Sequence, residues 1–246
     1  MSWLRTRVVH RQKWAEGLVS LRLEAELEPF EPGQWTNIAL DISGERVQRA
    51  YTLASAPREP PEFFVAAVST GRFSPRLAAL AVGDPMEIDR KPQGFFSLRW
   101  VPEAEDLWLV ASGTGLAPFV SMVRAGDVFK RFRRVVLVHG VREAAHLAYH
   151  EELFLHSQAH EGHLIQIPVV SREPGAPNAL HGRVTAALAS GELEVAAGLE
   201  LSPERSHVML CGNPAMIEEM TALLGERGLQ KHRQRSPGHV SSESYW

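Results

Sequence analysis

The sequence has very little cysteine: Cys211 is the only one among its 246 residues. A single thiol cannot form a disulfide within the chain, hold an iron–sulfur cluster or build a cysteine-rich zinc site. Histidines do not replace it, because His146 and His150 have the spacing of a zinc pair but lack the acidic partner of the metalloprotease pattern. We therefore expect no metal site, and we place these two histidines on the surface of a helix.

Long hydrophobic runs and a strong excess of charge are also missing. No stretch is long enough to span a membrane, and residues 1–7 lack the apolar run and small-residue cleavage site of a secretory signal. The net charge of -3 argues against binding to nucleic acid. We therefore expect a cytoplasmic protein that binds neither membranes nor nucleic acid.

The hydrophobic content of 44% is enough to bury a core in one large or two ordinary domains. Residues 1–100 contain short apolar or alternating segments separated by turn formers, a rhythm that predicts a small antiparallel β-barrel. One helix is expected over residues 74–80, because Ser74 suits the N-cap and Pro75 the first helical position. The expected strands span residues 8–9, 18–23, 35–40, 50–53, 63–68 and 86–88.

The rhythm changes from Glu103 onward. Continuous apolar runs, typical of strands buried on both faces, alternate with helical stretches and predict a doubly wound α/β parallel sheet. A polar connection around Pro102 marks the boundary, so we expect two domains, residues 1–100 and residues 101–246. The expected strands span residues 107–111, 135–138, 164–170 and 207–211, and the expected helices residues 118–129, 144–156, 184–189 and 215–227.

Two motifs in the first region suit a phosphorylated aromatic cofactor such as a flavin dinucleotide. The run Arg49-Ala50-Tyr51-Thr52 offers a cation, an aromatic face and a hydroxyl on one strand. Taken alone it also fits an ordinary edge strand with a core tyrosine. The run Gly71-Arg72-Phe73-Ser74 precedes the predicted helix, so its backbone amides could receive a pyrophosphate, or it could simply cap that helix.

The second region carries two features that suit a dinucleotide. The run Gly113-Thr114-Gly115 joins a strand to a helix, although Pro118 replaces the third glycine of the full fingerprint and a plain turn would also use glycine. Arg172, directly after Ser171, and Arg183 lie beyond the third strand of this region. Arginine with serine suits a ribose 2′-phosphate and so favours NADP over NAD, whereas two solvated surface arginines are the alternative.

The end of the chain adds three further features. Cys211-Gly212-Asn213-Pro214 closes the last predicted strand and would place the thiol where a nicotinamide ring lies, which indicates a positioning role. The basic run over residues 230–235 is either a solvated loop or part of a docking surface for an acidic protein. Tyr245 and Trp246 put two aromatic rings at the end, where they either fill a core or cover something planar.

Together these motifs resemble the bacterial ferredoxin/flavodoxin–NADP reductase family, in its short-chain branch with an aromatic C-terminus, over essentially the whole chain. The likeness rests on residues 49–52, 71–74, 113–115 with Pro118, Val138-His139, 170–172, 211–214 and 245–246, in the family's order. It implies reversible hydride exchange between NADP(H) and FAD, and single-electron transfer with ferredoxin or flavodoxin, which are acidic electron carriers. We expect a monomer. The sequence names neither the carrier nor the direction of electron flow.

The resemblance also implies site residues. The C-terminal tail would return to the flavin, and Trp246 would stack on it where the nicotinamide must arrive. Thr52 stands where many members have serine. The reacting rings are expected to lie among Thr52, Cys211, Glu243 and Trp246. FAD contacts are implied for Arg49, Ala50, Tyr51, Thr52, Phe64, Val65, Ala66, Ala67, Arg72, Phe73, Ser74, Thr114, Tyr245 and Trp246. NADP contacts are implied for Val141, Arg142, Ser171, Arg172 and Arg183.

Two other functions stay open on the sequence. One is an NAD(P)H-dependent flavin reductase that serves an oxygenase on a separate chain, since the single cysteine excludes an iron–sulfur domain in this one. The other is a non-catalytic module that retains the fold and senses dinucleotides.

Overall fold

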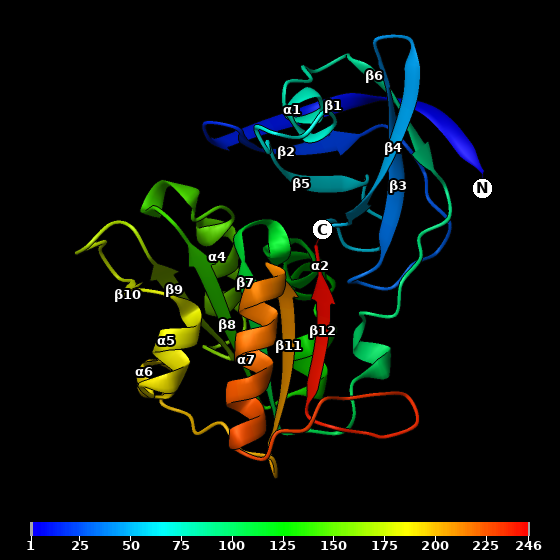
Figure 1. Cartoon of the computed structure of the whole chain (residues 1–246). Coiled ribbons are helices and arrows are strands. Elements are labelled where there is room, and N and C mark those ends of the chain that lie inside the picture. Colours follow the sequence, from blue (N-terminus) through cyan, green and yellow to red (C-terminus); the bar gives the residue numbers. More distant parts are fainter. Residues whose placement is uncertain (1, 246) are drawn as a thin grey trace.

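In the computed structural model, which describes residues 2–245, the chain forms two six-stranded sheets (Figure 1). The first is antiparallel, in the order β4-β3-β6-β1-β2-β5. A bridge between Leu53 and Phe63 joins the end of β4 to β5, so the two outer strands meet and the sheet curls into a barrel-like unit, as predicted. Its strands are β1 (Trp3–Ala15), β2 (Leu18–Leu23), β3 (Trp35–Ile42), β4 (Glu45–Thr52), β5 (Glu62–Ala66) and β6 (Pro85–Asp89).

The short helix α1 (Ser74–Ala78) covers the inside of this curled sheet, where Leu77 is fully buried in its core. The predicted N-cap was wrong. Phe73 occupies the N-cap, and Ser74 begins the helix with its Oγ accepting a hydrogen bond from the Val68 N–H at 3.0 Å. At the other end, Arg11 Nη2 donates to the Ala78 carbonyl at 3.2 Å.

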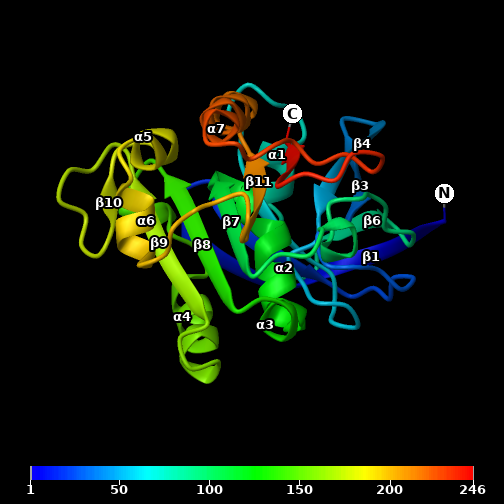
Figure 2. The same ribbon diagram turned by 90° about the horizontal axis from the view of Figure 1, so that it is seen from below.

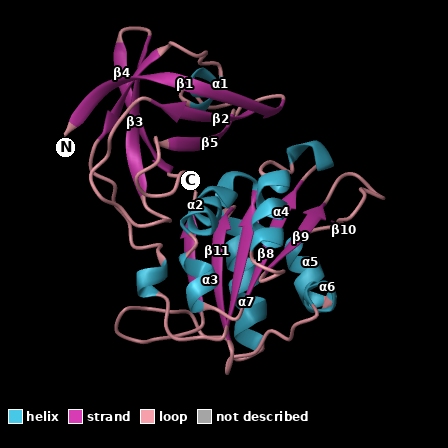
Figure 3. Ribbon diagram, turned by 180° about the vertical axis from the view of Figure 1, so that it is seen from behind, coloured by secondary structure: helices cyan, strands magenta, loops and turns pink. Residues whose placement is uncertain are grey.

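The second sheet is parallel throughout, in the order β10-β9-β8-β7-β11-β12. Helices cover both of its faces, as predicted for a doubly wound sheet (Figure 2 and Figure 3). Its strands are β7 (Asp106–Ser112), β8 (Arg134–Val141), β9 (Leu164–Val170), β10 (Leu180–His181), β11 (Ser206–Gly212) and β12 (Val240–Ser244). One face carries α2 (Ala117–Ala125), α3 (Asp127–Arg131) and α4 (His150–Ala159), the other α5 (Val184–Ala189), α6 (Glu192–Ala197) and α7 (Pro214–Glu226).

The continuous apolar runs follow from burial on both faces. In β7, Leu107 and Leu109 point into the core under α2 and α4, whereas Trp108 and Val110 point into the core under α5 and α7. Single turns of 3-10 helix complete the connections: η1 (Leu98–Trp100), η2 (Gly113–Leu116) and η3 (Ala144–His146).

Two predicted helices are interrupted. Residues 118–129 do not form one helix, because Gly126 adopts a left-handed backbone (φ +79°) that separates α2 from α3. Residues 144–156 are split as well: η3 is followed by an irregular segment, and α4 begins only after Tyr149, whose φ is +59°. Two strands, β10 and β12, were not predicted.

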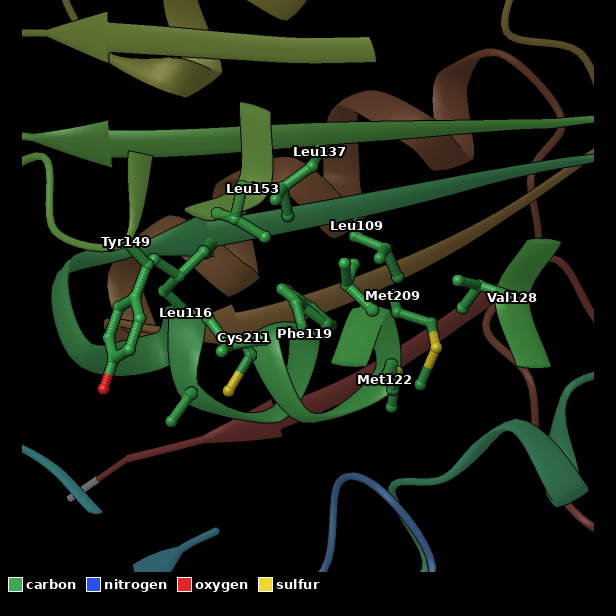
Figure 4. Close-up of a cluster of buried hydrophobic side chains, with 14 of the residues drawn as sticks. Leu109, Leu116, Phe119, Met122, Val128, Leu137, Tyr149, Leu153, Met209 and Cys211 are labelled. Atoms are coloured by element: carbon green, nitrogen blue, oxygen red, sulfur yellow. The ribbon is translucent and has the colours of Figure 1, made fainter. Parts of the chain in front are cut away.

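A single hydrophobic cluster joins the two sheets. It contains Leu18, Ala54 and Phe64 from the first sheet together with many side chains around α2 and α4, among them Phe119 and Tyr149. Figure 4 shows the α2 side of this cluster, with Leu116, Phe119 and Cys211 packed beneath Leu109 and Leu153. The end of β12 lies at the junction of the two sheets (Figure 1). Among residues 2–245, no helix is long and apolar enough to cross a membrane.

Candidate functional site

The residues of β4 that were predicted to contact FAD differ in how exposed they are. Arg49 is exposed, its Nη1 donates to the Gln48 carbonyl at 2.7 Å, and it forms no ion pair within residues 2–245. Tyr51 is half-buried, with its ring centroid 6.5 Å from that of Phe63 and 6.1 Å from that of Phe73. Burial raises the pKa of Tyr51 to about 12, so its hydroxyl stays neutral. Arg49 is thus free to meet an anion, and the Tyr51 ring is held by packing.

The other residues predicted to contact FAD divide into two groups. Ala67 and Arg72 are exposed, and Arg72 meets Glu45 at 3.2 Å in a surface ion pair that is easily exchanged for another anion. Phe64 and Phe73 are buried, at 3% and 4% exposure, and support the strands from inside. Val65 is also buried, Ala50 is exposed, and Ala66 and Ser74 are half-buried.

At the carboxyl end of the second sheet, the glycine turn that follows β7 crosses the end of β11. The two segments approach so closely at this crossing that only glycine fits. A Cβ on Gly115 would lie 2.3 Å from the Cys211 carbonyl oxygen, and a Cβ on Gly212 would lie 2.3 Å from Ser112 Oγ. His139 Nε2 donates to the Gly113 carbonyl at 3.1 Å. Burial lowers the pKa of His139 to about 4, so this histidine is neutral and its hydrogen bond fixes the turn without adding charge.

The crossing brings together predicted residues from distant parts of the chain. Cys211 is fully buried, and β12 pairs with β11 so that Glu243 lies opposite Cys211. The Tyr245 N–H donates to the Gly212 carbonyl at 3.1 Å, and the Tyr245 hydroxyl lies against the side chains of Thr52 and Cys211. Tyr245, which directly follows β12, therefore joins Thr52 of the first sheet to Cys211 of the second. Trp246, also predicted here, lies outside the described residues.

Burial opposes ionisation of all three titratable side chains of this cluster. Burial raises the pKa of the Cys211 thiol and of the Tyr245 phenol well above their usual values. The same cause raises the pKa of Glu243 to about 7, and its Oε2 is buried without a hydrogen-bond partner among residues 2–245. Glu243 can therefore hold or release a proton near neutral pH, whereas the thiol cannot ionise.

Three arginines lie just beyond the carboxyl ends of neighbouring strands in the second sheet, and we call this part of the sheet the arginine edge. Arg142 follows the end of β8, Arg172 comes two residues after β9, and Arg183 comes two residues after β10. These strands are adjacent and parallel, and the Ser171 N–H donates to the Val141 carbonyl at 3.0 Å, which ties the first two segments together. All three arginines are exposed and form no ion pair within the described chain. Such an edge suits a phosphate group.

The basic run over residues 230–235 does not belong to this site. It lies in the loop that leads into β12 (Figure 1), so it is at the opposite edge of the parallel sheet from Cys211. Thr114, in contrast, is part of the glycine turn and is buried.

Sequence reasoning missed a set of polar residues behind the site: Glu62, Ser121, Arg124 and Tyr149. One signal was present in the sequence. Ser121 and Arg124 stand three residues apart on a helix that is otherwise apolar, and so share one face of it.

The residues at the junction fit two dinucleotides. They include a glycine turn that opens a helix, a carboxyl whose Oε2 is buried without a partner among residues 2–245, and exposed arginines on both sheets that form no ion pair within the same residues. Backbone amides and arginines of this kind suit phosphate groups.

Comparison with known proteins agrees with this geometry. The family "Oxidoreductase FAD-binding domain" matches residues 13–97, and "Oxidoreductase NAD-binding domain" matches residues 109–222. Flavodoxin/ferredoxin–NADP reductases of Shigella flexneri and Escherichia coli are each 44% identical over 246 residues, covering 99% of both chains. A ferredoxin NADP+ reductase from Neisseria gonorrhoeae, crystallised with bound FAD and NADP, superposes with a TM-score of 0.93 at 26% identity and covers 100% of both chains.

The predicted resemblance is thereby confirmed: the fold, both domain families and full-length relatives agree. The chain belongs to the flavodoxin/ferredoxin–NADP reductase family.

Proposed function

We propose that the protein exchanges a hydride between NADP(H) and bound FAD, and single electrons with ferredoxin or flavodoxin. The observation that carries this proposal is that Tyr245 lies between Thr52, from the antiparallel sheet, and Cys211, from the parallel sheet. This contact joins β4, which carries the exposed Arg49, to the sheet whose strands β8, β9 and β10 are followed by three exposed arginines. The full-length relatives at 44% identity support the same activity.

We further propose that residues 1–100 form the FAD-binding domain and residues 101–246 the NADP-binding domain. This division is supported by the change of sheet between Asp89, where β6 ends, and Asp106, where β7 begins.

FAD would be held mainly by the first of these domains. Arg49 and Arg72 would contact its pyrophosphate together with the backbone around Ser74, and Tyr51 would lie against its ring system. Thr52 would touch the reacting edge, while Thr114 and Tyr245 would reach it from the other domain. Bound FAD would supply the step between hydride and single-electron chemistry, which no side chain can perform.

NADP(H) would be held at the edge formed by β8, β9 and β10. Ser171, Arg172 and Arg183 would bind the 2′-phosphate, with Val141 and Arg142 beside them. Because Gly115 packs directly on the Cys211 carbonyl, the glycine turn would be held beside Cys211, where the nicotinamide end would lie. The neutral Cys211 thiol would pack against the ring and take no part in proton transfer.

The end of the chain would complete the site. Glu243, with a pKa of about 7, would hold a proton at its carboxyl in a region that the two sheets close to water. Trp246 would stack where the nicotinamide must arrive and would have to move away. We also propose that the protein is a cytoplasmic monomer and that its partner is an acidic electron carrier.

An anaerobic titration tests the function. The purified protein should be yellow with FAD, NADPH should bleach the flavin absorbance, and reduced ferredoxin or flavodoxin should do the same. Protein that stays colourless after incubation with FAD would overturn the proposal.

Two outcomes would favour the other functions. Transfer of electrons to free flavin, but not to ferredoxin or flavodoxin, would indicate a reductase that serves an oxygenase. Bound FAD that NADPH does not bleach would indicate a module that only senses dinucleotides.

A further inference from the structure

Two side chains of α2 bind the backbone that directly follows the Arg49–Thr52 strand. Ser121 Oγ donates to the Ser55 carbonyl at 2.6 Å, and Arg124 Nη1 donates to the Ala54 carbonyl at 3.0 Å. Ser121 is fully buried, and the Arg124 side chain is only 10% exposed. The helix α2 follows directly on the Gly113–Leu116 turn. It is therefore attached to the proposed dinucleotide turn and also hydrogen-bonds the backbone after the proposed FAD strand.

Arg124 is fixed by carboxylates on both sides. Its Nε and Nη2 donate to the two carboxylate oxygens of Glu152, on α4, at 2.6 and 2.9 Å. Nη2 also meets Glu62 Oε1, on β5, at 3.3 Å. The guanidinium carbon lies 5.4 Å from the centre of the Tyr149 ring. A two-pronged contact of this kind leaves the guanidinium very little freedom to rotate.

Glu62 is the matching anchor on the first sheet, and its side chain is 5% exposed. It accepts from Arg22 Nη2 at 2.7 Å and from the Tyr149 hydroxyl at 2.8 Å. Burial opposes its ionisation, but Arg124 and the hydrogen bonds from Arg22 and Tyr149 outweigh burial and lower the pKa of Glu62. The junction is therefore a charged network that stays intact at neutral pH.

Residues 54–55 and Glu62 are also joined through their backbones. The Ala54 N–H donates to the Glu62 carbonyl at 2.8 Å, and the Glu62 N–H donates to Ser55 Oγ at 3.2 Å. Residues 54–55 are thus held by β5 on one side and by α2 on the other. Thr52 is separated from this held segment by Leu53 alone.

We infer that Arg124 is a positioning residue, which fixes the Thr52 end of the flavin strand relative to the dinucleotide turn through Ala54 and Glu62. This inference rests on the proposed function. A simple role in stability would require only that Arg124 join the two sheets at any point. Its bond to a carbonyl two residues beyond Thr52 instead ties it to the segment where the reacting rings would meet.

The test compares Arg124→Met with Arg227→Met in the FAD-loaded protein. Arg227, the C-cap residue directly after α7, is a matched control: it donates to Glu194 Oε2 and to the Leu188 carbonyl, each at 2.6 Å, but stays within the parallel-sheet half. In stopped-flow mixing with NADPH, Arg124→Met should slow flavin reduction by about tenfold or more, because small misplacements of reacting groups are costly. Arg227→Met should reduce the flavin at the wild-type rate.

Two further measurements separate positioning from loss of stability. The visible circular dichroism of bound FAD, recorded without NADPH, should change in Arg124→Met and not in Arg227→Met. The NADP+ dissociation constant should stay within about threefold of wild type in both variants, because the arginine edge is intact. Arg124→Lys, which keeps the charge but not the fork, should be intermediate.

If Arg124→Met does not fold, Arg124→Lys replaces it, since that change keeps the charge but removes the two-pronged contact with Glu152. Wild-type protein that NADPH does not bleach would refute the proposed function. Bleaching at the wild-type rate in Arg124→Met or, failing that, Arg124→Lys, or equal slowing in Arg227→Met, would refute the positioning role alone.

Discussion

Glu243 shows how one half-buried side chain can tie stability to pH. It lies opposite Cys211 and beside Tyr245, and burial raises the pKa of both neighbours, so neither ionises near neutral pH. Burial also raises the pKa of Glu243 itself from 4.5 to about 7. The folded protein therefore binds this proton more tightly than the unfolded chain does.

The sign follows from linkage. Below the unfolded pKa of 4.5 the carboxyl is protonated in both states, and between that value and about 7 stability falls as pH rises. We expect Glu243→Gln to have a higher melting temperature than wild type at about pH 8 and no such advantage at about pH 4. Thermal unfolding of the FAD-free protein measures this. Parallel pH profiles for the two proteins would contradict the prediction.

The arginine edge gives a second prediction about single residues. Replacing Arg172 or Arg183 with alanine removes a charge-assisted hydrogen bond to the proposed 2′-phosphate, worth about 1.5–3 kcal/mol, or roughly tenfold to a hundredfold in binding. The KM for NADPH should rise by that factor and the KM for NADH should hardly change. Arg76→Ala, an exposed arginine on α1, is the control. Equal effects on both nucleotides would show that no 2′-phosphate is bound there.

At the scale of elements, the breaks in the helices are set by backbone conformation. Gly126, with φ +79°, ends α2, whereas Gly225 lies inside α7 with an ordinary helical backbone. A Cβ added at either position meets no described atom within 4 Å. The two sites therefore differ in conformation and not in available space.

The same substitution should act in opposite directions at these two glycines. Gly126→Ala should lower the free energy of unfolding by about 1–2 kcal/mol, because a left-handed backbone strains a residue with a Cβ. Gly225→Ala should raise it by about 0.5–1 kcal/mol, because alanine favours a helix interior. Urea unfolding of both variants provides the measurement, and a shift of the same sign in both would refute the argument.

Helices and strands that are specified by their own residues could be predicted from the sequence, whereas those that depend on contacts with distant residues could not. The expected strands at residues 18–23 and 164–170 coincide with β2 and β9, because their apolar pattern alone specifies a buried strand. In contrast, β12 has one apolar residue, Val240, and becomes a strand only because it pairs with β11. The start of α4 depends on the left-handed Tyr149, whose ring packs against Trp14 from the other sheet.

The site divides in the same way. Arg49 and the glycine turn belong to short motifs that the sequence displays, and in the fold Tyr245 lies between Thr52 and Cys211. Glu62 and Arg124 could not be paired from sequence, because the polar face that Ser121 and Arg124 share on α2 does not indicate which strand of the other sheet it meets.

At the scale of the whole molecule, the two sheets share one hydrophobic cluster that includes Phe64 and Phe119. A shared core couples unfolding of one part to unfolding of the other. We expect the FAD-free protein to melt in a single transition, with equal calorimetric and van't Hoff enthalpies, as differential scanning calorimetry can determine.

Core substitutions in each sheet test this coupling. Leu77→Ala removes a fully buried side chain from the antiparallel core, and Leu188→Ala removes one from the parallel side. Each should cost about 2–5 kcal/mol and lower the same single transition. A separate low-temperature transition in Leu77→Ala would show that the first sheet melts alone.

The contacts that join the sheets are also far apart along the chain. Tyr149 and Glu62 are separated by 87 residues, and Arg124 and Ala54 by 70. Closing such long loops costs entropy, so neighbouring strand pairs such as β1 with β2 form earlier and the junction forms late. Inside the sheets, Trp3 pairs with Asp89 and Trp108 with Val208 over comparable separations, so we expect each sheet and the junction between them to be completed late in folding.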